Sequence, residues 1–264
     1  MPSVHRLLDV PQVRSQAKSL AELGLHAGID LTNTASLFGS HWDRDARELG
    51  RRLRSELLKT VVRGPGSDLP LGALDPYVVD QVRACHDRAI TAAMHYGAKR
   101  YLVGLGTSRG MPRSERLSRL DATSVMLRHF AQACTTRGLA LAVEPHAESD
   151  PDALDLLLDV LAEVDAGLVL SPSAVLCAGH DLDQVLHSVD GHLVGLDLTD
   201  RMANDLEPRP LGQGVLADVD FLPELVVRDD IEFCVLDLPA PMTQDAVVGL
   251  NALARAAQPE HVGV

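Results

Sequence analysis

Residues 139–146 read LALAVEPH, a short apolar run that ends on a carboxylate, Glu144. A continuous apolar run of this length is typical of a parallel strand that is covered on both faces. An unpaired carboxylate at the end of such a run is costly, so Glu144 should have a partner, bind a metal ion or transfer protons. The stretch therefore predicts a buried strand with a candidate site at its C-terminal end.

Seven similar apolar runs alternate with longer amphipathic segments, which predicts an α/β fold with a parallel sheet. We expect the other strands at Val4–Leu8, Ala27–Leu31, Leu57–Val62, Arg100–Leu105, Gly167–Leu170, His192–Leu198 and Ile231–Leu238. Eight strand–helix units in 264 residues fit one (β/α)8 barrel, which typically uses about 250 residues. We therefore predict a single TIM-barrel domain over residues 1–264. The alternative, a doubly wound open sheet, would call for a Gly-x-Gly-x-x-Gly segment after the first strand, where the sequence has none.

Start and stop signals frame the helices between these runs. Asp75 is expected to cap a helix that has Pro76 at its first position and ends at Gly97. Asp121 is expected to open a further helix that ends at Gly138. These signals place helices between consecutive strands, as a barrel requires.

The composition argues against several classes of function. The formal net charge of −13 disfavours binding to nucleic acid or to anionic membranes. The four cysteines form no Cys-x-x-Cys pair, so neither a structural zinc site nor a disulfide framework is indicated. No apolar stretch is long enough to cross a bilayer, and the N-terminus lacks a signal-peptide pattern. We expect a cytoplasmic protein that acts on a small molecule and could form homo-oligomers.

Three strands each end near a carboxylate: Glu144, Asp197 and Asp237. The strand ends of a TIM barrel meet at one mouth, where the active sites of such barrels lie. Three carboxylates there could hold a hard divalent cation, or could act as an acid–base pair in which crowding raises one pKa. They could equally cap helices or pair with arginines, and for Asp200, which follows the same strand as Asp197, that structural role is favoured.

Four other residues are candidate substrate contacts. Arg63 follows the third strand and could clamp an anionic or hydroxylated substrate, and His146 lies just beyond Glu144. Arg201 lies in a polar loop after the seventh strand, a region that binds phosphate in many barrels. Trp42, the only tryptophan, could stack on a sugar or could fill a gap in the packing.

Several short pieces occur in an order that resembles a known family. Leu141–Glu144 forms an apolar strand that ends on Glu, and Gly179–Asp181 forms a Gly-x-Asp piece after the sixth strand. Leu211–Gly214, which reads LGQG, is followed by Val219–Phe221, which reads VDF. From about Leu7 to Leu253 the chain resembles the sugar phosphate isomerase/epimerase group of xylose isomerase-like TIM barrels.

This resemblance implies a divalent metal ion held by Glu, Asp, His and Glu from strands five to eight. Here those positions carry Glu144, Ser171, Asp197 and Asp237. Histidines that often follow strands three, four and six are replaced by Arg63, Gly104 and Ala174, respectively. If these residues bind a metal ion, a ligand set without imidazole would suit Mg²⁺ or Mn²⁺ better than Zn²⁺. The site could also work without a metal ion.

Three functional hypotheses follow. The first is an isomerase or epimerase in which Glu144 and Asp237 exchange a proton next to a carbonyl of a small polyhydroxylated or keto substrate, while Asp197 holds a cation or orients a hydroxyl. The second is a metal-independent lyase, dehydratase or cyclase that uses the same mouth. The third is a non-catalytic binding protein, or a subunit whose partner carries the chemistry.

Overall fold

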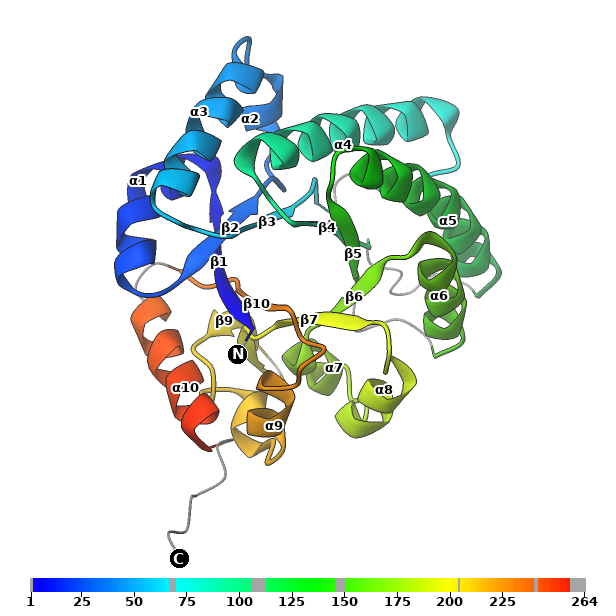
Figure 1. Ribbon diagram of the computed structural model, residues 1–264. Helices are drawn as coiled ribbons and strands as arrows, with labels where there is room; N and C mark the ends of the chain where they lie inside the picture. Colours follow the sequence, from blue (N-terminus) through cyan, green and yellow to red (C-terminus); the bar gives the residue numbers. More distant parts are fainter. Residues whose placement is uncertain are drawn as a thin grey trace, which may run out of the picture.

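The eight expected strands close into a parallel barrel, in a computed structural model that describes residues 2–66, 70–105, 113–145, 151–203, 205–239 and 242–256. The closed order is β1-β10-β7-β6-β5-β4-β3-β2 (Figure 1). The strands are β1 (Ser3–Asp9), β2 (His26–Asp30), β3 (Thr60–Arg63), β4 (Arg100–Gly104), β5 (Ala140–Glu144), β6 (Gly167–Leu170), β7 (Leu193–Asp197) and β10 (Phe233–Leu236). The predicted (β/α)8 fold is confirmed.

Helices surround the barrel on its outer side (Figure 1). They are α1 (Val10–Glu22), α2 (Ala35–Phe38), α3 (Trp42–Ser55), α4 (Pro76–Tyr96), α5 (Arg113–Thr136), α6 (Pro151–Val164), α7 (Pro172–Cys177), α8 (Leu182–Ser188), the 3-10 turn η1 (Val215–Asp218), α9 (Leu222–Val226) and α10 (Thr243–Ala256). The predicted frame of α4 is confirmed, because the Asp75 side chain accepts hydrogen bonds from two backbone N–H groups of the first turn, and Gly97 ends the helix with φ of 77°.

Two sequence-based boundaries were wrong. Helix α5 begins at Arg113 rather than at Asp121, and a Glu115–Arg119 ion pair of i,i+4 spacing lies in its added turns. The third strand begins at Thr60 rather than at Leu57. Leu57 is 87% exposed and has φ of 57°, so it belongs to the turn that ends α3.

The barrel has a small hydrophobic layer inside and a large one between its strands and the helices. The inner layer consists of Leu7, Val61, Leu102, Ala142, Val169, Phe233 and Val235. Side chains two residues apart on a strand lie on the same face. The residues two positions after Val61, Ala142 and Val235 are therefore also directed inward at the C-terminal end of the barrel, and they are Arg63, Glu144 and Asp237. The same period brings Ser171 and Asp197 to the mouth.

The segment after β7 leaves the barrel as a small antiparallel hairpin, formed by β8 (Asp200–Met202) and β9 (Asp205–Arg209). From the sequence this segment was expected to be a polar loop. Two strands this short carry no clear alternation of apolar and polar residues, so hydropathy alone does not reveal them.

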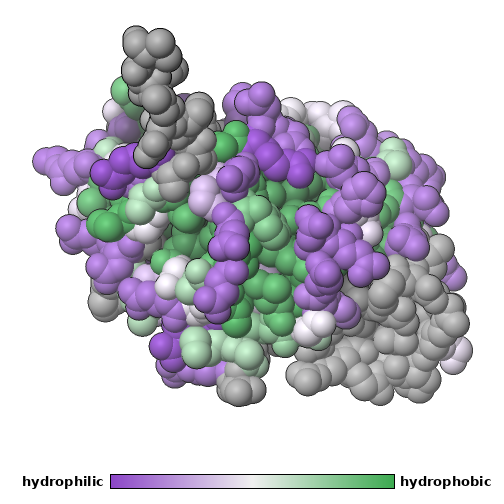
Figure 2. Space-filling model, turned by 90° about the horizontal axis from the view of Figure 1, so that it is seen from below, coloured by the Kyte–Doolittle hydropathy of each residue, from purple (hydrophilic) through white to green (hydrophobic). Residues whose placement is uncertain are grey.

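Figure 2 shows the side of the barrel that carries α7 to α10. Hydrophobic side chains gather near the centre of this face, and hydrophilic ones flank them. Within the described part of the chain, no helix is both long and apolar enough to span a membrane.

Candidate functional site

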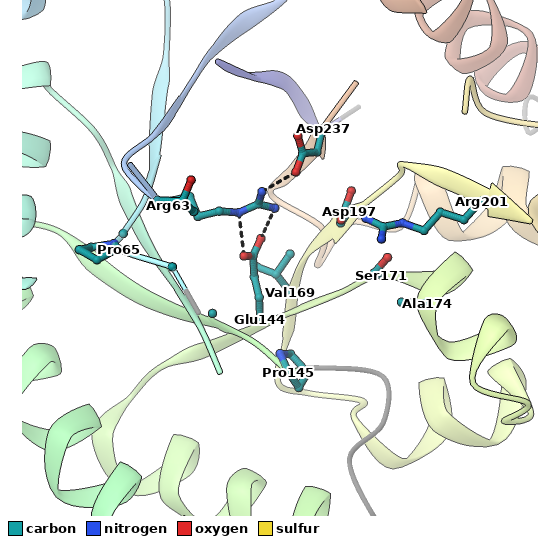
Figure 3. Close-up of a pocket in the computed structure, with 14 residues that line it drawn as sticks. Arg63, Pro65, Glu144, Pro145, Val169, Ser171, Ala174, Asp197, Arg201 and Asp237 are labelled. Atoms are coloured by element: carbon teal, nitrogen blue, oxygen red, sulfur yellow. Dashed lines mark hydrogen bonds and ion pairs between the residues drawn. The ribbon is translucent and has the colours of Figure 1, made fainter. Parts of the chain in front are cut away.

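A pocket of about 260 Å³ opens at the C-terminal mouth of the barrel. Residues from the ends of strands β3 to β7, and from loops that include those after β2 and β10, form its wall (Figure 3). The lining residues are Thr32, Arg63, Gly64, Pro65, Gly66, Gly104, Glu144, Pro145, Val169, Ser171, Ala174, Asp197, Arg201 and Asp237. Most of the wall is small and uncharged, so the polar chemistry is concentrated in three carboxylates and two arginines.

Arg63 lies between two of these carboxylates (Figure 3). Its Nε and one Nη donate to the two oxygens of Glu144 at 2.9 and 3.0 Å, and its other Nη donates to Oδ2 of Asp237 at 2.8 Å. A guanidinium has five N–H groups, so two of them have no partner among the described residues. Arg63 therefore joins β3, β5 and the end of β10, and it still has donors for a ligand.

Burial disfavours the charge on Arg63, whose side chain is only 13% exposed. The charges of Glu144, Asp197 and Asp237 more than offset that cost, and the pKa of Arg63 is raised above its ordinary value. The guanidinium is therefore a fixed positive charge at any pH at which the protein is folded.

Asp197 is the most deeply buried of the three carboxyl groups. Desolvation raises the pKa of Asp197, and the nearby Arg63 and the hydrogen bonds from Thr199 oppose that rise only in part. The backbone N–H and the hydroxyl of Thr199 both donate to Oδ1 of Asp197, at 3.0 and 2.5 Å. The surroundings of Asp197 thus favour its protonated form more than water does.

Thr199 is a site residue that was not predicted from the sequence. Its hydroxyl oxygen also accepts the backbone N–H of Asp237 at 2.9 Å, and its carbonyl accepts the hydroxyl of Ser173 at 2.5 Å. One fully buried side chain therefore positions both Asp197 and Asp237. The only signal in the sequence was a hydroxyl residue two positions after a strand-end acid, a pattern too common to single out.

Replacing Thr199 by Val should keep the shape of the side chain while removing this link. We expect the free energy of unfolding to fall by about 1–3 kcal/mol, because the Asp237 N–H and the Asp197 carboxyl each lose a buried partner. The pKa of Asp197 should rise further, since Thr199 lowers it. Urea unfolding measures the first effect. The exposed Thr135 on α5 provides the control, and an equal loss in Thr135→Val would contradict the assignment.

Asp200 has the structural role that was favoured from the sequence. Its carboxylate accepts backbone N–H groups from Arg201, Gly212, Gly214 and Leu216 at 2.8–3.1 Å. It thereby ties the β8–β9 hairpin to the LGQG segment behind the mouth. A Cβ on Gly214 would come within 2.5 Å of Oδ1 of Asp200, so the loop requires glycine at this position.

The other predicted site residues divide into three groups. Arg201, Ser171, Gly104 and Ala174 line the pocket, and Arg201 extends toward the side where Asp197 and Ser171 lie (Figure 3). Trp42 does not: it begins α3, packs against the outer core and lines a separate hollow with residues of α4 and α5. The expectation that Trp42 stacks on a substrate at the mouth is therefore corrected. His146 lies outside the described residues.

The profile of the xylose isomerase-like TIM barrel family matches residues 18–250. The chain belongs to this family. No curated protein matches it by sequence. Among solved structures, a Thermus thermophilus protein soaked with ZnCl₂ superposes with a TM-score of 0.80 at 23% identity, covering 97% of this chain and 100% of that one.

Two further structures share the fold at lower identity. A 3-keto-D-glucoside 4-epimerase from E. coli has a TM-score of 0.72 at 18% identity, and endonuclease IV from Thermus thermophilus has 0.69 at 16%. Each comparison covers 97% of this chain and 100% of the other. The fold of this family thus serves proteins with different named activities, and only the site can indicate which chemistry this member performs.

The divalent cation that the family resemblance implies does not fit the residues at this mouth. Both oxygens of Glu144 and one of Asp237 accept hydrogen bonds from the Arg63 guanidinium, and one oxygen of Asp197 accepts two from Thr199. Throughout the described ranges, no three His, Cys, Asp or Glu side chains are arranged to hold a metal ion. The metal set of Glu144, Asp197 and Asp237, with Ser171 as a fourth member, thus stays a prediction, and in this structure its carboxylates are bound by Arg63 and Thr199.

Proposed function

We propose that this protein is an isomerase or epimerase that moves a proton at the carbon next to a carbonyl of a small polyhydroxylated or keto substrate. The observation that carries the proposal is the gathering of three carboxyl groups from three strands around one fixed guanidinium in a single pocket. A volume of about 260 Å³ suits a ligand smaller than a drug-sized molecule.

Removing a proton next to a carbonyl places negative charge on the carbonyl oxygen. The two N–H groups of Arg63 that have no partner in the described chain are suited to bind that oxygen. A charge already fixed in a partly desolvated site stabilises the enediolate without reorganisation. Glu144 orients the guanidinium through its paired hydrogen bonds, whereas the sequence alone suggested that Glu144 exchanges the proton.

The remaining two acids differ in ways that suit opposite roles. The Asp237 side chain is 46% exposed, and only one of its oxygens contacts Arg63, so it is the candidate base. Asp197 is buried with a raised pKa, so it is the candidate proton donor. If Asp237 removes a proton from one face of the carbon and Asp197 returns one to the other face, the centre inverts.

Exchange of substrate α-protons in D₂O, followed by NMR over a panel of sugars and keto acids, tests this proposal. Asp237→Asn should lower the exchange rate by about 10²–10⁴-fold, the usual contribution of a general base. Asp229→Asn is the matched control, since Asp229 is exposed and precedes β10 at the opposite end of the barrel. No exchange with any member of the panel would count against an isomerase and favour a binding subunit.

One observation supports a second candidate, a lyase or dehydratase. The carboxyl of Asp197, whose pKa is raised by burial, could protonate a leaving hydroxyl instead of a carbon. The first step would again be removal of the α-proton. Product analysis separates the two reactions, because a dehydratase forms an unsaturated or deoxygenated product and releases water, whereas an epimerase conserves the composition of its substrate.

A further inference from the structure

We propose that the Arg63 guanidinium is a built-in cation that occupies the place of a divalent metal ion between Glu144 and Asp237, and that the mouth works without a metal. The catalytic part of this inference rests on the proposed function, but the occupancy of the cation position does not. It can be measured without turnover.

The geometry of the mouth places Arg63 where a bridging cation would bind. A metal ion at this mouth would need oxygens of Glu144 and Asp237, which come from strands that are not neighbours in the barrel. Three N–H groups of Arg63 already join these two side chains at 2.8–3.0 Å. The guanidinium therefore lies between the two carboxylates that a bridging cation would contact. Its positive charge disfavours a second cation at the same position.

The charges at the mouth agree with this placement. Three carboxylates, from Glu144, Asp197 and Asp237, line the pocket together with Arg63. The buried guanidinium supplies one positive charge among them, so it offsets part of the negative charge that would otherwise attract a cation.

The guanidinium is held firmly enough to act as a fixed group. The side chains of Arg63 and Glu144 are only 13% and 16% exposed, and their paired geometry fixes the plane of the guanidinium. A metal ion could bind one or two substrate oxygens at its open positions. The two remaining N–H groups of Arg63 offer the same capacity to a carbonyl or a hydroxyl oxygen.

Binding of Mn²⁺ alone, measured by the EPR signal of the free ion, tests the occupancy of the site. The wild-type chain and Arg63→Lys, which retains a positive charge, should bind no Mn²⁺ in the pocket even at millimolar concentration. Arg63→Gln removes the charge with little change in size. It should bind Mn²⁺ at least about tenfold more tightly than the wild type, because a like charge beside a cation is strongly unfavourable.

The site of any new binding is checked with the double variant Arg63→Gln/Glu144→Gln, which should lose the gain. Circular dichroism verifies that each variant is folded, and if Arg63→Gln does not fold, Arg63→Ala takes its place. Binding of Mn²⁺ by the wild type that disappears in Glu144→Gln would overturn the proposal. A folded Arg63→Gln that gains no Mn²⁺ affinity would overturn it as well.

Proton exchange measured after chelation distinguishes a failure of this inference from a failure of the proposed function. Proton exchange by the wild type should be unchanged after exhaustive chelation. If no substrate of the panel exchanges, the proposed function fails, while the Mn²⁺ measurements still decide whether Arg63 occupies the cation position. If exchange is lost on chelation and restored by added Mn²⁺, the built-in cation is refuted and the isomerase reaction stands.

Discussion

Replacing Glu144 by Gln should destabilise the protein by about 3 kcal/mol, although the two side chains have nearly the same size. The neutral amide removes one negative charge beside the buried Arg63. It also turns an N–H donor toward a guanidinium that has only donors. Breaking a buried ion pair on one side typically costs about 3–5 kcal/mol, and the retained contact with Asp237 favours the low end of that range. Urea unfolding followed by circular dichroism measures the loss.

Two further variants identify the origin of this effect. Asp237→Asn should cost clearly less, because the Asp237 side chain is 46% exposed and solvent screens its charge. Arg63→Met combined with Glu144→Gln removes the incompletely paired guanidinium together with its main partner, so it should be more stable than Glu144→Gln alone. Equal destabilisation in the single and the double variant would show that packing, rather than the charge on Arg63, determines the stability of this site.

The strand ends were the most informative part of the sequence. An acid after each of three apolar runs, and Arg63 after a fourth, predicted side chains that share one mouth, and all four line the pocket. This prediction succeeded because the two-residue period of a strand and the common direction of parallel strands leave little choice of position. Neither rule requires knowledge of a particular side-chain conformation.

The partners of these side chains could not be predicted in the same way. Arg63 was expected to clamp a substrate, yet it directs three N–H groups to Glu144 and Asp237. Whether a long side chain reaches across a barrel depends on its rotamer and on the space left by residues from other strands. Here small residues such as Gly104 and Ala174 line the mouth, and the sequence does not reveal that they lie around the pocket together.

The helix layer caused a different kind of error. Trp42 follows the second strand, so its place in the chain resembled that of a mouth residue. The short helix α2 intervenes between β2 and Trp42, and α3 carries the indole to the outer side of the barrel. Position along the chain after a strand therefore predicts location at the mouth only for the first few residues of the loop.

Lowering the pH from 6.5 toward 4.5 should destabilise the protein steeply, by about 2.7 kcal/mol per pH unit. Two histidines contribute most to this effect, because burial lowers the pKa of His5 and of His86 to about 3, and burial lowers the pKa of His26 as well. In the unfolded chain both take up protons below their ordinary pKa of 6.5, while in the native state they remain neutral. The unfolded state thus binds more protons throughout this window, so stability is lost as the pH falls.

Burial favours the neutral form of both rings, and for His5 the hydrogen bond to the Ala27 carbonyl opposes it only in part. His5 makes hydrogen bonds to the carbonyl of Ala27 and to the hydroxyl of Ser3 at 3.2 and 2.9 Å, which a neutral ring satisfies as one donor and one acceptor. The ring of His86 stacks on Phe130, and its Nδ1 contacts the hydroxyl of Tyr101 at 2.8 Å, whereas its buried Nε2 has no partner among the described residues. A proton on that nitrogen would be a buried and unpaired charge.

Asp197 acts in the opposite direction, because its raised pKa lets the native state retain a proton that the unfolded state has released. That contribution adds stability as the pH falls toward the ordinary value of 3.8. This gain offsets the loss of stability caused by the histidines mainly at the acidic end of the range between pH 6.5 and pH 4.5. The steepest loss is therefore expected about one pH unit below 6.5, where histidines of the unfolded chain are almost fully protonated and few of its carboxyl groups have titrated.

Urea unfolding at intervals between pH 7 and pH 4.5 measures the slope, and His86→Asn isolates one of its sources. Asn can retain a contact with Tyr101 but does not titrate, so the slope should fall by about 1.4 kcal/mol per pH unit, the contribution of one proton. His187→Asn, at an exposed position on α8, should leave the slope unchanged. If His86→Asn has the slope of the wild type, His86 is protonated in the native state, and the acid sensitivity must originate elsewhere.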